Sequence, residues 1–146
     1  MKNHSFVRRL VAASLLLTTM TTTGSASSQG NKTQFGYCFS GGGTNCVVDG
    51  DTFWIDGEKV RIADIDAPET HQPRCPQEKA LGDAATERLH ALLNAGSFRL
   101  ASISRDTDRY GRKLRIVVRN GSSIGEELVA EGLAREWDGA RHPWCV

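Results

Sequence analysis

The spacing of hydrophobic positions changes along the chain, and each spacing predicts a different element. From Cys46 to Ile65, Val, Ile, Thr, Phe and Trp dominate and the Asp56-Gly57 turn interrupts them, which predicts two or three antiparallel strands. From Gln77 to Asn94, apolar residues recur every three or four positions. This periodicity predicts an amphipathic helix closed by Gly96.

The second half of the chain repeats both patterns on a smaller scale. Residues 97–102 and 114–119 alternate as strands do, so we expect a second hairpin, and residues 123–131 predict a short helix that ends at Gly132. Three strands, a helix and two strands lack the regular alternation of a doubly wound parallel sheet. The order instead predicts an α+β fold, mainly β, built on a small antiparallel barrel.

The N-terminal 26 residues have the pattern of a secretory signal peptide. Basic residues precede an apolar run from Leu10 to Met20, and small residues follow it, so we place cleavage after Ala26. A membrane anchor is the alternative, but the run is shorter than the roughly 20 apolar residues that span a bilayer. We therefore expect a secreted or periplasmic protein that has no membrane contact after cleavage.

After cleavage, 120 residues remain, a length typical of one domain. Residues 27–36 are polar and aperiodic and predict a flexible lead-in, and residues 37–146 form the expected domain. Loss of Lys2, Arg8 and Arg9 with the signal peptide changes the formal net charge from +1 to −2. Contact with a nucleic acid would therefore depend on local arginines or a metal ion, because no overall positive field would attract it.

All four cysteines lie in the mature part, and an even number in an exported chain predicts disulfides. Cys38 and Cys46 lie symmetrically about Gly42, so a hairpin turn there would place them opposite each other. Cys75 and Cys145 then pair by elimination. A four-thiolate zinc site is the alternative, although the chain lacks a CxxC pair.

The carboxylates of the segment VVDGDT indicate either a metal site or a backbone bulge. Asp49 and Asp51 would leave the same face of an extended strand, and Asp51 joined by Asp66 offers the oxygen ligands that calcium prefers. The alternative is a bulge at Gly50 in which the aspartates cap backbone groups. The tetrapeptide DGDT, residues 49–52, favours the bulge when it is taken alone.

The segments VRIADIDAPET and DTDRYGRKLR add further charged candidates. Arg61 and Asp66 are five residues apart, so they can meet only if the strand bends near residues 63–65. Arg112 lies in a cluster of basic residues around a Tyr-Gly turn, and the arginine fork suits phosphate. Ordinary surface ion pairs and a solvated hairpin tip are the alternatives for these two segments.

Taken together, VVDGDTFWIDGEKVRIADIDAPET, DRYGRKLRIVV and ELVAEGLAR closely resemble the thermonuclease, or staphylococcal nuclease-like, family over about residues 46–137. The resemblance implies a five-stranded Greek-key OB-type barrel with two to three helices. It also implies a calcium-dependent nuclease that cuts DNA and RNA with low sequence specificity and leaves 3′-phosphates. A noncatalytic OB-fold nucleic-acid-binding module is the alternative.

Roles follow from the resemblance position by position. Asp51 and Asp66 match the calcium carboxylates, and Ala67, where the family commonly has Thr, would still offer its backbone carbonyl. Asp49 matches an aspartate in the outer part of the metal site. Glu69 matches the glutamate that positions or deprotonates the attacking water. The phosphate-binding pair of the family corresponds to Arg61 and Arg112.

The C-terminal segment EWDGARHPWCV departs from the family pattern, because it ends early and lacks the tyrosines that contact the nucleobase. Trp137, His142 or Trp144 could stack on bases instead, and packing against the barrel is the alternative for at least one of the tryptophans. We expect a monomer.

Overall fold

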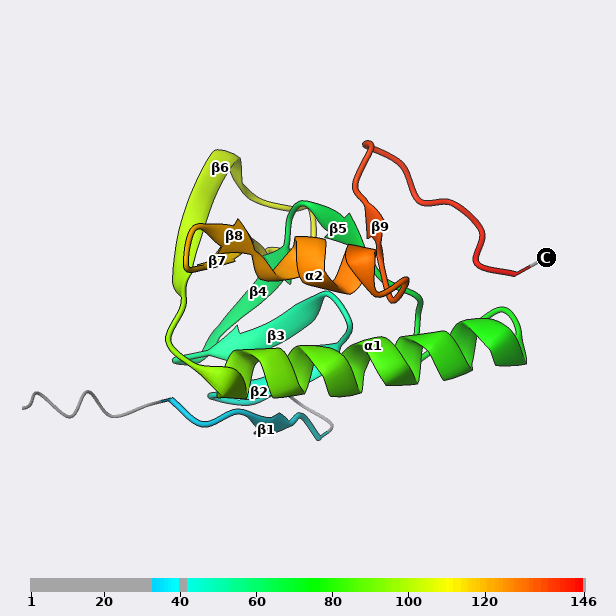
Figure 1. Ribbon diagram of the computed structural model, residues 1–146, viewed down its shortest axis with the longest axis horizontal. Helices are drawn as coiled ribbons and strands as arrows, with labels where there is room; N and C mark the ends of the chain where they lie inside the picture. The colour runs from blue at the N-terminus through cyan, green and yellow to red at the C-terminus, as the bar shows by residue number, and fades with distance from the viewer. Residues whose placement is uncertain (1–32, 40–41, 146) are drawn as a thin grey trace, which may run out of the picture. The chain divides into compact units, whose positions relative to one another are not determined.

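A computed structural model describes residues 33–39 and 42–145, which belong to one packed unit (Figure 1). The predicted signal peptide and residues 27–32 lie outside these ranges. Within them, strands and helices follow one another in this order: β1 (Gly36–Tyr37), β2 (Cys46–Asp49), β3 (Thr52–Ile55), β4 (Glu58–Ile62), β5 (Ile65–Asp66), α1 (Pro76–Ala95), β6 (Arg99–Thr107), β7 (Lys113–Arg119), β8 (Ser122–Ser123), α2 (Ile124–Ala130) and β9 (Arg135–Glu136).

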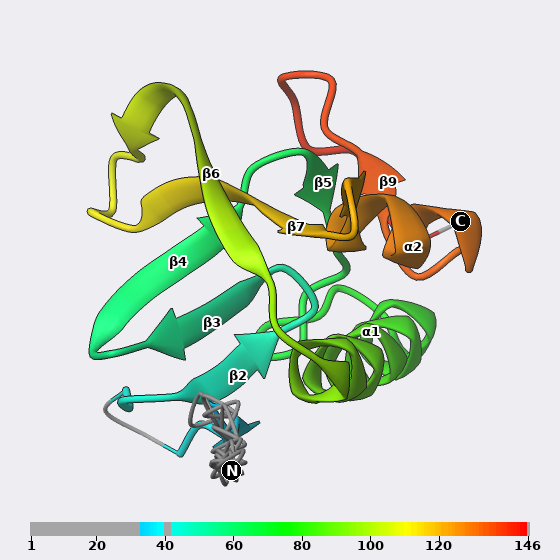
Figure 2. The same ribbon diagram turned by 60° about the vertical axis from the view of Figure 1, so that its left-hand side comes forward.

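The main sheet has the strand order β1-β2-β3-β4-β7-β6, with β8 paired to β7, and β5 pairs with β9 in a second, two-stranded sheet. Strands β2, β3 and β4 form an antiparallel meander, β4 pairs with β7 in parallel, and β6 and β7 form the second hairpin. Figure 2 shows the strong coiling of this sheet above α1. The predicted α+β fold of OB type is confirmed.

The predicted turn and helices lie close to their expected positions. Asp56 (φ 50°) and Gly57 (φ 81°) both adopt the left-handed conformation that a tight two-residue hairpin turn requires. Helix α1 extends the predicted range by one residue at each end, with Pro76 in its first turn. Helix α2 also matches its prediction. Neither helix in the described ranges has the length and apolar character that crossing a membrane requires.

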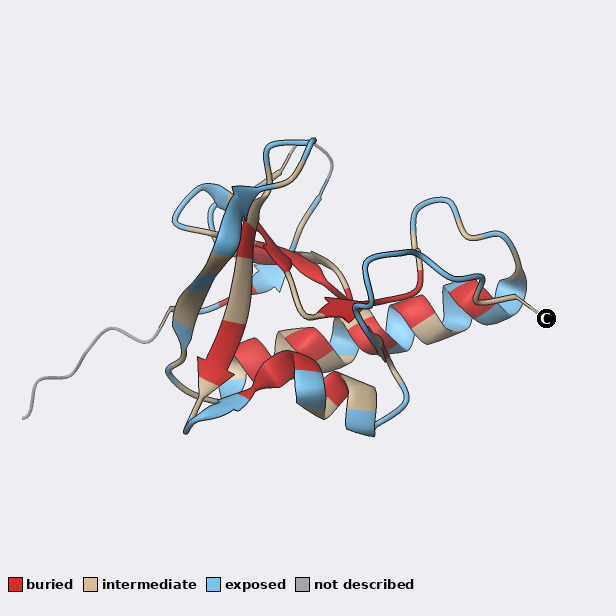
Figure 3. Ribbon diagram, turned by 90° about the horizontal axis from the view of Figure 1, so that it is seen from above, coloured by how far each residue is buried: buried red, intermediate tan, exposed pale blue. Residues whose placement is uncertain are grey.

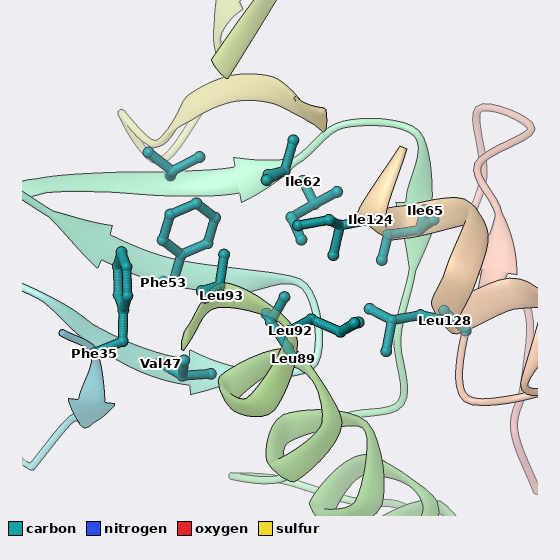
Figure 4. Packing of buried hydrophobic residues seen from close by; sticks show 13 residues of the cluster. Phe35, Val47, Phe53, Ile62, Ile65, Leu89, Leu92, Leu93, Ile124 and Leu128 are labelled. Atoms are coloured by element: carbon teal, nitrogen blue, oxygen red, sulfur yellow. The ribbon is translucent and has the colours of Figure 1, made fainter. Parts of the chain in front are cut away.

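The core fills the space between α1, α2 and the coiled sheet (Figures 3 and 4). Leu89, Leu92 and Leu93 from the buried face of α1 meet side chains from the strands and from α2. The other labelled side chains in Figure 4 are Phe35, Val47, Phe53, Ile62, Ile65, Ile124 and Leu128. Burial of this cluster supplies the main favourable free energy of folding.

The flexible lead-in was expected to extend to residue 36, but Phe35 already belongs to the packed core. Phe35 is 4% exposed, and its ring packs edge-on against that of Phe53, with 6.0 Å between the ring centroids. Its backbone is also held, because its N–H donates to Asn94 Oδ1 at 2.9 Å and its carbonyl oxygen lies 2.8 Å from His90 Nε2. The packed domain therefore begins before residue 37.

Both disulfides have the predicted pairing. Cys38–Cys46 joins the segment after β1 to β2, and Cys75–Cys145 joins the residue before α1 to the C-terminal segment. All four thiols are therefore used, and the zinc alternative is wrong. The second bridge joins two cysteines that are 70 positions apart in the sequence.

Gly50 is expected to tolerate no side chain, because a Cβ there would lie 2.6 Å from the Cβ of Ala85 in α1 and 2.9 Å from the Cβ of Ala67. Gly50→Ala should lower the free energy of unfolding by about 1–3 kcal/mol, as overpacking does. Urea unfolding measures the change. Gly36→Ala is the matched control, since nothing lies within 4 Å of its Cβ position. Equal midpoints for the two variants would contradict this close approach.

Candidate active site

Three side chains with opposite charges converge where β4 ends. Arg61 Nη2 lies 3.2 Å from Asp51 Oδ2 and 3.5 Å from Asp66 Oδ1, and all three residues are at most 5% exposed. They meet because β4 ends at Ile62 and the chain turns before β5 begins at Ile65. This turn is the bend that the odd spacing of Arg61 and Asp66 required.

The bulge and the acidic cluster, which were alternatives in the sequence, occur together. The register of β2 and β3 shifts between Val47 and Asp49, and Asp49 Oδ1 accepts a hydrogen bond from the Asp51 N–H at 3.1 Å. Asp49 therefore caps the backbone, as in an Asx turn. Asp51 is thereby turned inward, where Thr52 Oγ1 donates to its Oδ1 at 2.7 Å and the Ala67 N–H donates to its Oδ2 at 3.4 Å.

Negative charge accumulates around Arg61. Burial raises the pKa of Asp66, and the Asp51 carboxylate adds to the rise, while Arg141 and Arg61 act against it. Desolvation, with the charge of Asp51 as the second cause, raises the pKa of Asp49 to about 7. Burial is the first cause of both pKa shifts and the negative charge of Asp51 is the second, so these carboxylates are both withdrawn from water and close to one another.

These residues fit a hard divalent cation. Asp51 and Asp66 supply buried carboxylate oxygens, and the backbone of Ala67 lies beside Asp51 through the hydrogen bond from its N–H. Oxygen ligands of this kind suit calcium, and an added positive charge would relieve the repulsion between the carboxylates. In the described residues, Cys75, Glu78 and Cys145 also form a compact group, but both sulfurs belong to a disulfide.

A cleft of about 890 Å³ adjoins this cluster. Its lining is rich in arginine and also includes Glu69, Tyr110 and Trp137. The arginines that line it are Arg61, Arg105, Arg109, Arg112 and Arg141. Arginines concentrated around one concave surface favour binding of a polyanion, even though the formal net charge of the whole chain is only +1.

Arg112 is held on two sides and is not a solvated residue at a hairpin tip. Its Nε donates to Asp108 Oδ2 at 2.6 Å, and its Nη1 donates to Thr52 Oγ1 at 3.3 Å. Thr52 also donates to Asp51, so one hydroxyl links the predicted phosphate-binding arginine to the predicted metal ligand. The structure thus brings Arg112 to the same site as Arg61.

Glu69 lies at the cleft wall, and an arginine from the far end of the chain reaches it. Its side chain is 37% exposed and forms an ion pair with Arg141, 72 residues away. Arg141 Nε also lies 3.7 Å from Asp66 Oδ1. The predicted site residues Asp51, Arg61, Asp66, Glu69 and Arg112 are therefore connected through direct contacts and their shared neighbours Thr52 and Arg141.

A sequence model described as staphylococcal nuclease homologue matches residues 59–143, which is more than half of the 146 residues. The chain belongs to the staphylococcal nuclease homologue family. The matched range contains Arg61, Asp66, Glu69 and Arg112, whereas Asp51 precedes it. The resemblance in the sequence motifs is thus confirmed at the level of the family.

Individual relatives in the family are similar over part of their length. Endonuclease YncB of Bacillus subtilis (strain 168) is 40% identical over 95 residues, or 61% of this chain and 44% of YncB. The SPbeta prophage-derived endonuclease YokF of the same organism is 40% identical over 95 residues, or 61% of this chain and 31% of YokF. Thermonuclease of Staphylococcus intermedius is 37% identical over 93 residues, or 61% of this chain and 55% of that thermonuclease. The chain thus spans about a third to just over half the length of these relatives.

The aromatic candidates of the C-terminal segment differ in their surroundings. Trp137 lines the cleft, and the Arg61 guanidinium lies 5.0 Å from its ring centroid. The ring centroid of Trp144 lies 3.7 Å from the guanidinium carbon of Arg135. His142 Nε2 lies 2.8 Å from Asp138 Oδ2. Of the three, only Trp137 lines this cleft.

Sequence reasoning assigned no role to Thr52, Asp108 or Arg141. Thr52 and Asp108 lie inside the quoted motifs, and their closeness to Asp51 and Arg112 in sequence was a usable signal. Arg141 offered no such signal, because its partners are distant along the chain. Tyr110, 68% exposed, also lines the cleft and is a further aromatic surface.

Asp108→Asn is expected to lower the melting temperature near neutral pH, because it removes the ion pair that holds Arg112. Burial alone would raise the pKa of Asp108, but hydrogen bonds from the side chain and backbone of Arg112 outweigh it and lower that pKa below 3.8. A lowered folded-state pKa stabilises the fold above the ordinary value and ceases to do so as pH falls through the folded value.

Melting curves from pH 7 to pH 2.5 measure this effect. The difference between parent and Asp108→Asn should be constant above about pH 5 and should vanish only below pH 3.8. The exposed pair Lys79–Asp83 offers the control variant Asp83→Asn, for which little change is expected. A difference that disappears above the ordinary pKa of Asp would contradict the assigned pairing.

Proposed function

We propose that this chain is a calcium-dependent nuclease that hydrolyses phosphodiester bonds of DNA and RNA with low sequence specificity and leaves 3′-phosphates. One observation carries the proposal: the buried pair Asp51 and Asp66 contacts Arg61, which also lines an arginine-rich cleft beside Glu69. Membership of the family supports it, as do relatives that are named endonuclease and thermonuclease.

The chain's own residues divide the work of hydrolysis. Glu69 holds a water molecule and accepts its proton as the water oxygen bonds to phosphorus. The bond from phosphorus to the 5′ oxygen breaks, and this oxygen takes up a proton from the surrounding water and leaves as a hydroxyl group. Arg61 and Arg112 donate to the phosphoryl oxygens, whose negative charge grows in the transition state.

Calcium, when bound by Asp51, Asp66 and the Ala67 carbonyl, supplies positive charge against the phosphoryl oxygens. Asp49 stands behind this set, because its carboxylate accepts the backbone N–H of Asp51 and so fixes the direction of the metal ligand. Asp108 and Thr52 similarly hold the fork of Arg112 before substrate arrives. A site organised in advance avoids part of the ordering cost in the transition state.

Low sequence specificity follows from the same lining. Arginines contact phosphates, which carry no sequence information, and the faces of Tyr110 and Trp137 can stack on any base. Export suits the chemistry, since both disulfides require an oxidising compartment such as the bacterial periplasm or the cell exterior. A monomer is sufficient, because all the proposed catalytic residues come from one chain.

The alternative is an OB-fold module that binds nucleic acid without cutting it. Such a module would have no need for two buried carboxylates around a single arginine, because the negative charge in excess of that arginine weakens binding of a polyanion. The presence of Glu69 at the same cleft also favours hydrolysis.

Cleavage assays decide between these functions. The purified protein is incubated with single- and double-stranded DNA and with RNA, in calcium or in chelator, and the product ends are identified. We expect both DNA and RNA to be cleaved in calcium and neither to be cleaved in chelator. The products should carry 3′-phosphate and 5′-hydroxyl ends. Binding without cleavage would favour the noncatalytic module, and cleavage that persists in chelator would contradict the role of calcium.

Arg112→Lys is expected to lower kcat/KM on single-stranded DNA by about 100-fold, because an ammonium group cannot make the planar two-point contact with phosphoryl oxygens. Initial rates in calcium measure the loss, and melting curves exclude unfolding. Arg119→Lys is the matched control, since Arg119 donates to backbone carbonyl oxygens of α1 and the following loop and does not line the cleft. Parent-like activity of folded Arg112→Lys would show that this arginine does not bind the reacting phosphate.

A further inference from the structure

The C-terminal segment, residues 137–145, is attached to the domain at both ends. It follows β9, which pairs with β5 so that Arg135 lies opposite Asp66, and the Trp137 N–H donates to the Asp64 carbonyl at 2.9 Å. At the other end, Cys145 is bonded to Cys75 just before α1. Figure 1 shows this segment, in red, returning to the N-terminal end of α1.

Contacts within the C-terminal segment also fix its path. Arg135 Nη1 donates to the Pro143 carbonyl at 3.0 Å, and its guanidinium covers the ring of Trp144. Asp138 pairs with His142 and accepts the Ala140 N–H at 3.1 Å. Arg141 is therefore presented from a segment whose neighbours on both sides are held.

Arg141 extends from this segment into the cleft. Its Nη1 pairs with Glu69 Oε1, its Nε lies 3.7 Å from Asp66 Oδ1, and its side chain is 48% exposed. A half-exposed ion pair of this kind contributes little to stability, so a structural role does not account for its placement between two site carboxylates. A guanidinium has five N–H donors, and these contacts engage only part of that capacity.

We propose that Arg141 is a third phosphate-binding residue of the cleft, positioned by the Cys75–Cys145 disulfide. The inference rests on the proposed nuclease function. A phosphodiester that enters the cleft carries the same single negative charge as the Glu69 carboxylate, and its two non-bridging oxygens offer the Arg141 guanidinium a second two-point partner. When Arg141 changes partner, Glu69 is released to hold the attacking water, so substrate binding and activation of the water are linked.

The salt dependence of binding tests this proposal, because each phosphate contact on a single strand contributes about 0.7 to the slope of log K against log salt. The probe is a labelled 12-nucleotide oligothymidylate in chelator, measured by fluorescence anisotropy from 25 to 200 mM NaCl. Arg141→Gln should weaken binding roughly tenfold at low salt and reduce the slope by about 0.7. Arg141→Lys should retain the slope, since it keeps the charge.

The control variant is Arg99→Gln. Arg99 is an exposed residue of β6 that does not line the cleft, so this variant should keep the slope of the parent protein. In calcium, Arg141→Gln should raise KM for the same oligonucleotide, and its kcat should change less. A parent slope in Arg141→Gln overturns the proposal. Faster cleavage by this variant would overturn it too, because Arg141 would then be a cover over Glu69.

The disulfide's share in this role is tested by the double variant Cys75→Ser/Cys145→Ser at a temperature where its melting curve shows it folded. It should lose the same 0.7 in slope, and adding Arg141→Gln should cause no further loss. If the double variant keeps the parent protein's slope of log K against log salt, the claim that the disulfide positions Arg141 is wrong. If the parent protein neither binds nor cleaves the oligonucleotide, the proposed function itself is wrong, which is a different result from loss of slope in one variant.

Discussion

Asp51 and Asp66 share one arginine, Arg61, at 3.2 and 3.5 Å, and all three are nearly excluded from water. Buried charges are costly unless they are paired, so the local backbone must place this triad accurately. Gly50 does so on one side by packing against α1, and the break between β4 and β5 does so on the other. The arginine-lined cleft and the C-terminal segment are arranged around this triad.

The sequence predicts those parts of the fold that depend on local chemistry. Asp56-Gly57 forms its turn because both residues tolerate the left-handed conformation. The period of the leucines in α1 identifies its buried face because one face of a helix repeats every three to four residues. The site residues were identified by motifs, and the odd spacing of Arg61 and Asp66 already required the bend that the structure contains.

Contacts between distant segments were not predictable in this way. Phe35 looked like part of a polar lead-in, because its partner Phe53 lies in β3, far from it along the chain. Arg141 occurs in a short irregular segment, and only the Cys75–Cys145 bridge and the pairing of β9 with β5 bring it to Glu69. The turn at Asn120-Gly121 between β7 and β8 is different, since both residues adopt the left-handed conformation and an Asn-Gly pair is a strong local turn signal.

Calcium titration tests the central claim, that the buried aspartates form a cation site, most directly. Isothermal titration calorimetry on the parent protein should give one calcium ion per chain, and Asp51→Asn should weaken that binding at least tenfold, because half of the carboxylate ligands are lost. Asp83 is an exposed carboxylate paired with Lys79, so the control variant Asp83→Asn should bind calcium as the parent protein does. A parent protein that binds no calcium, or a folded Asp51→Asn variant that binds it unchanged, would contradict the account.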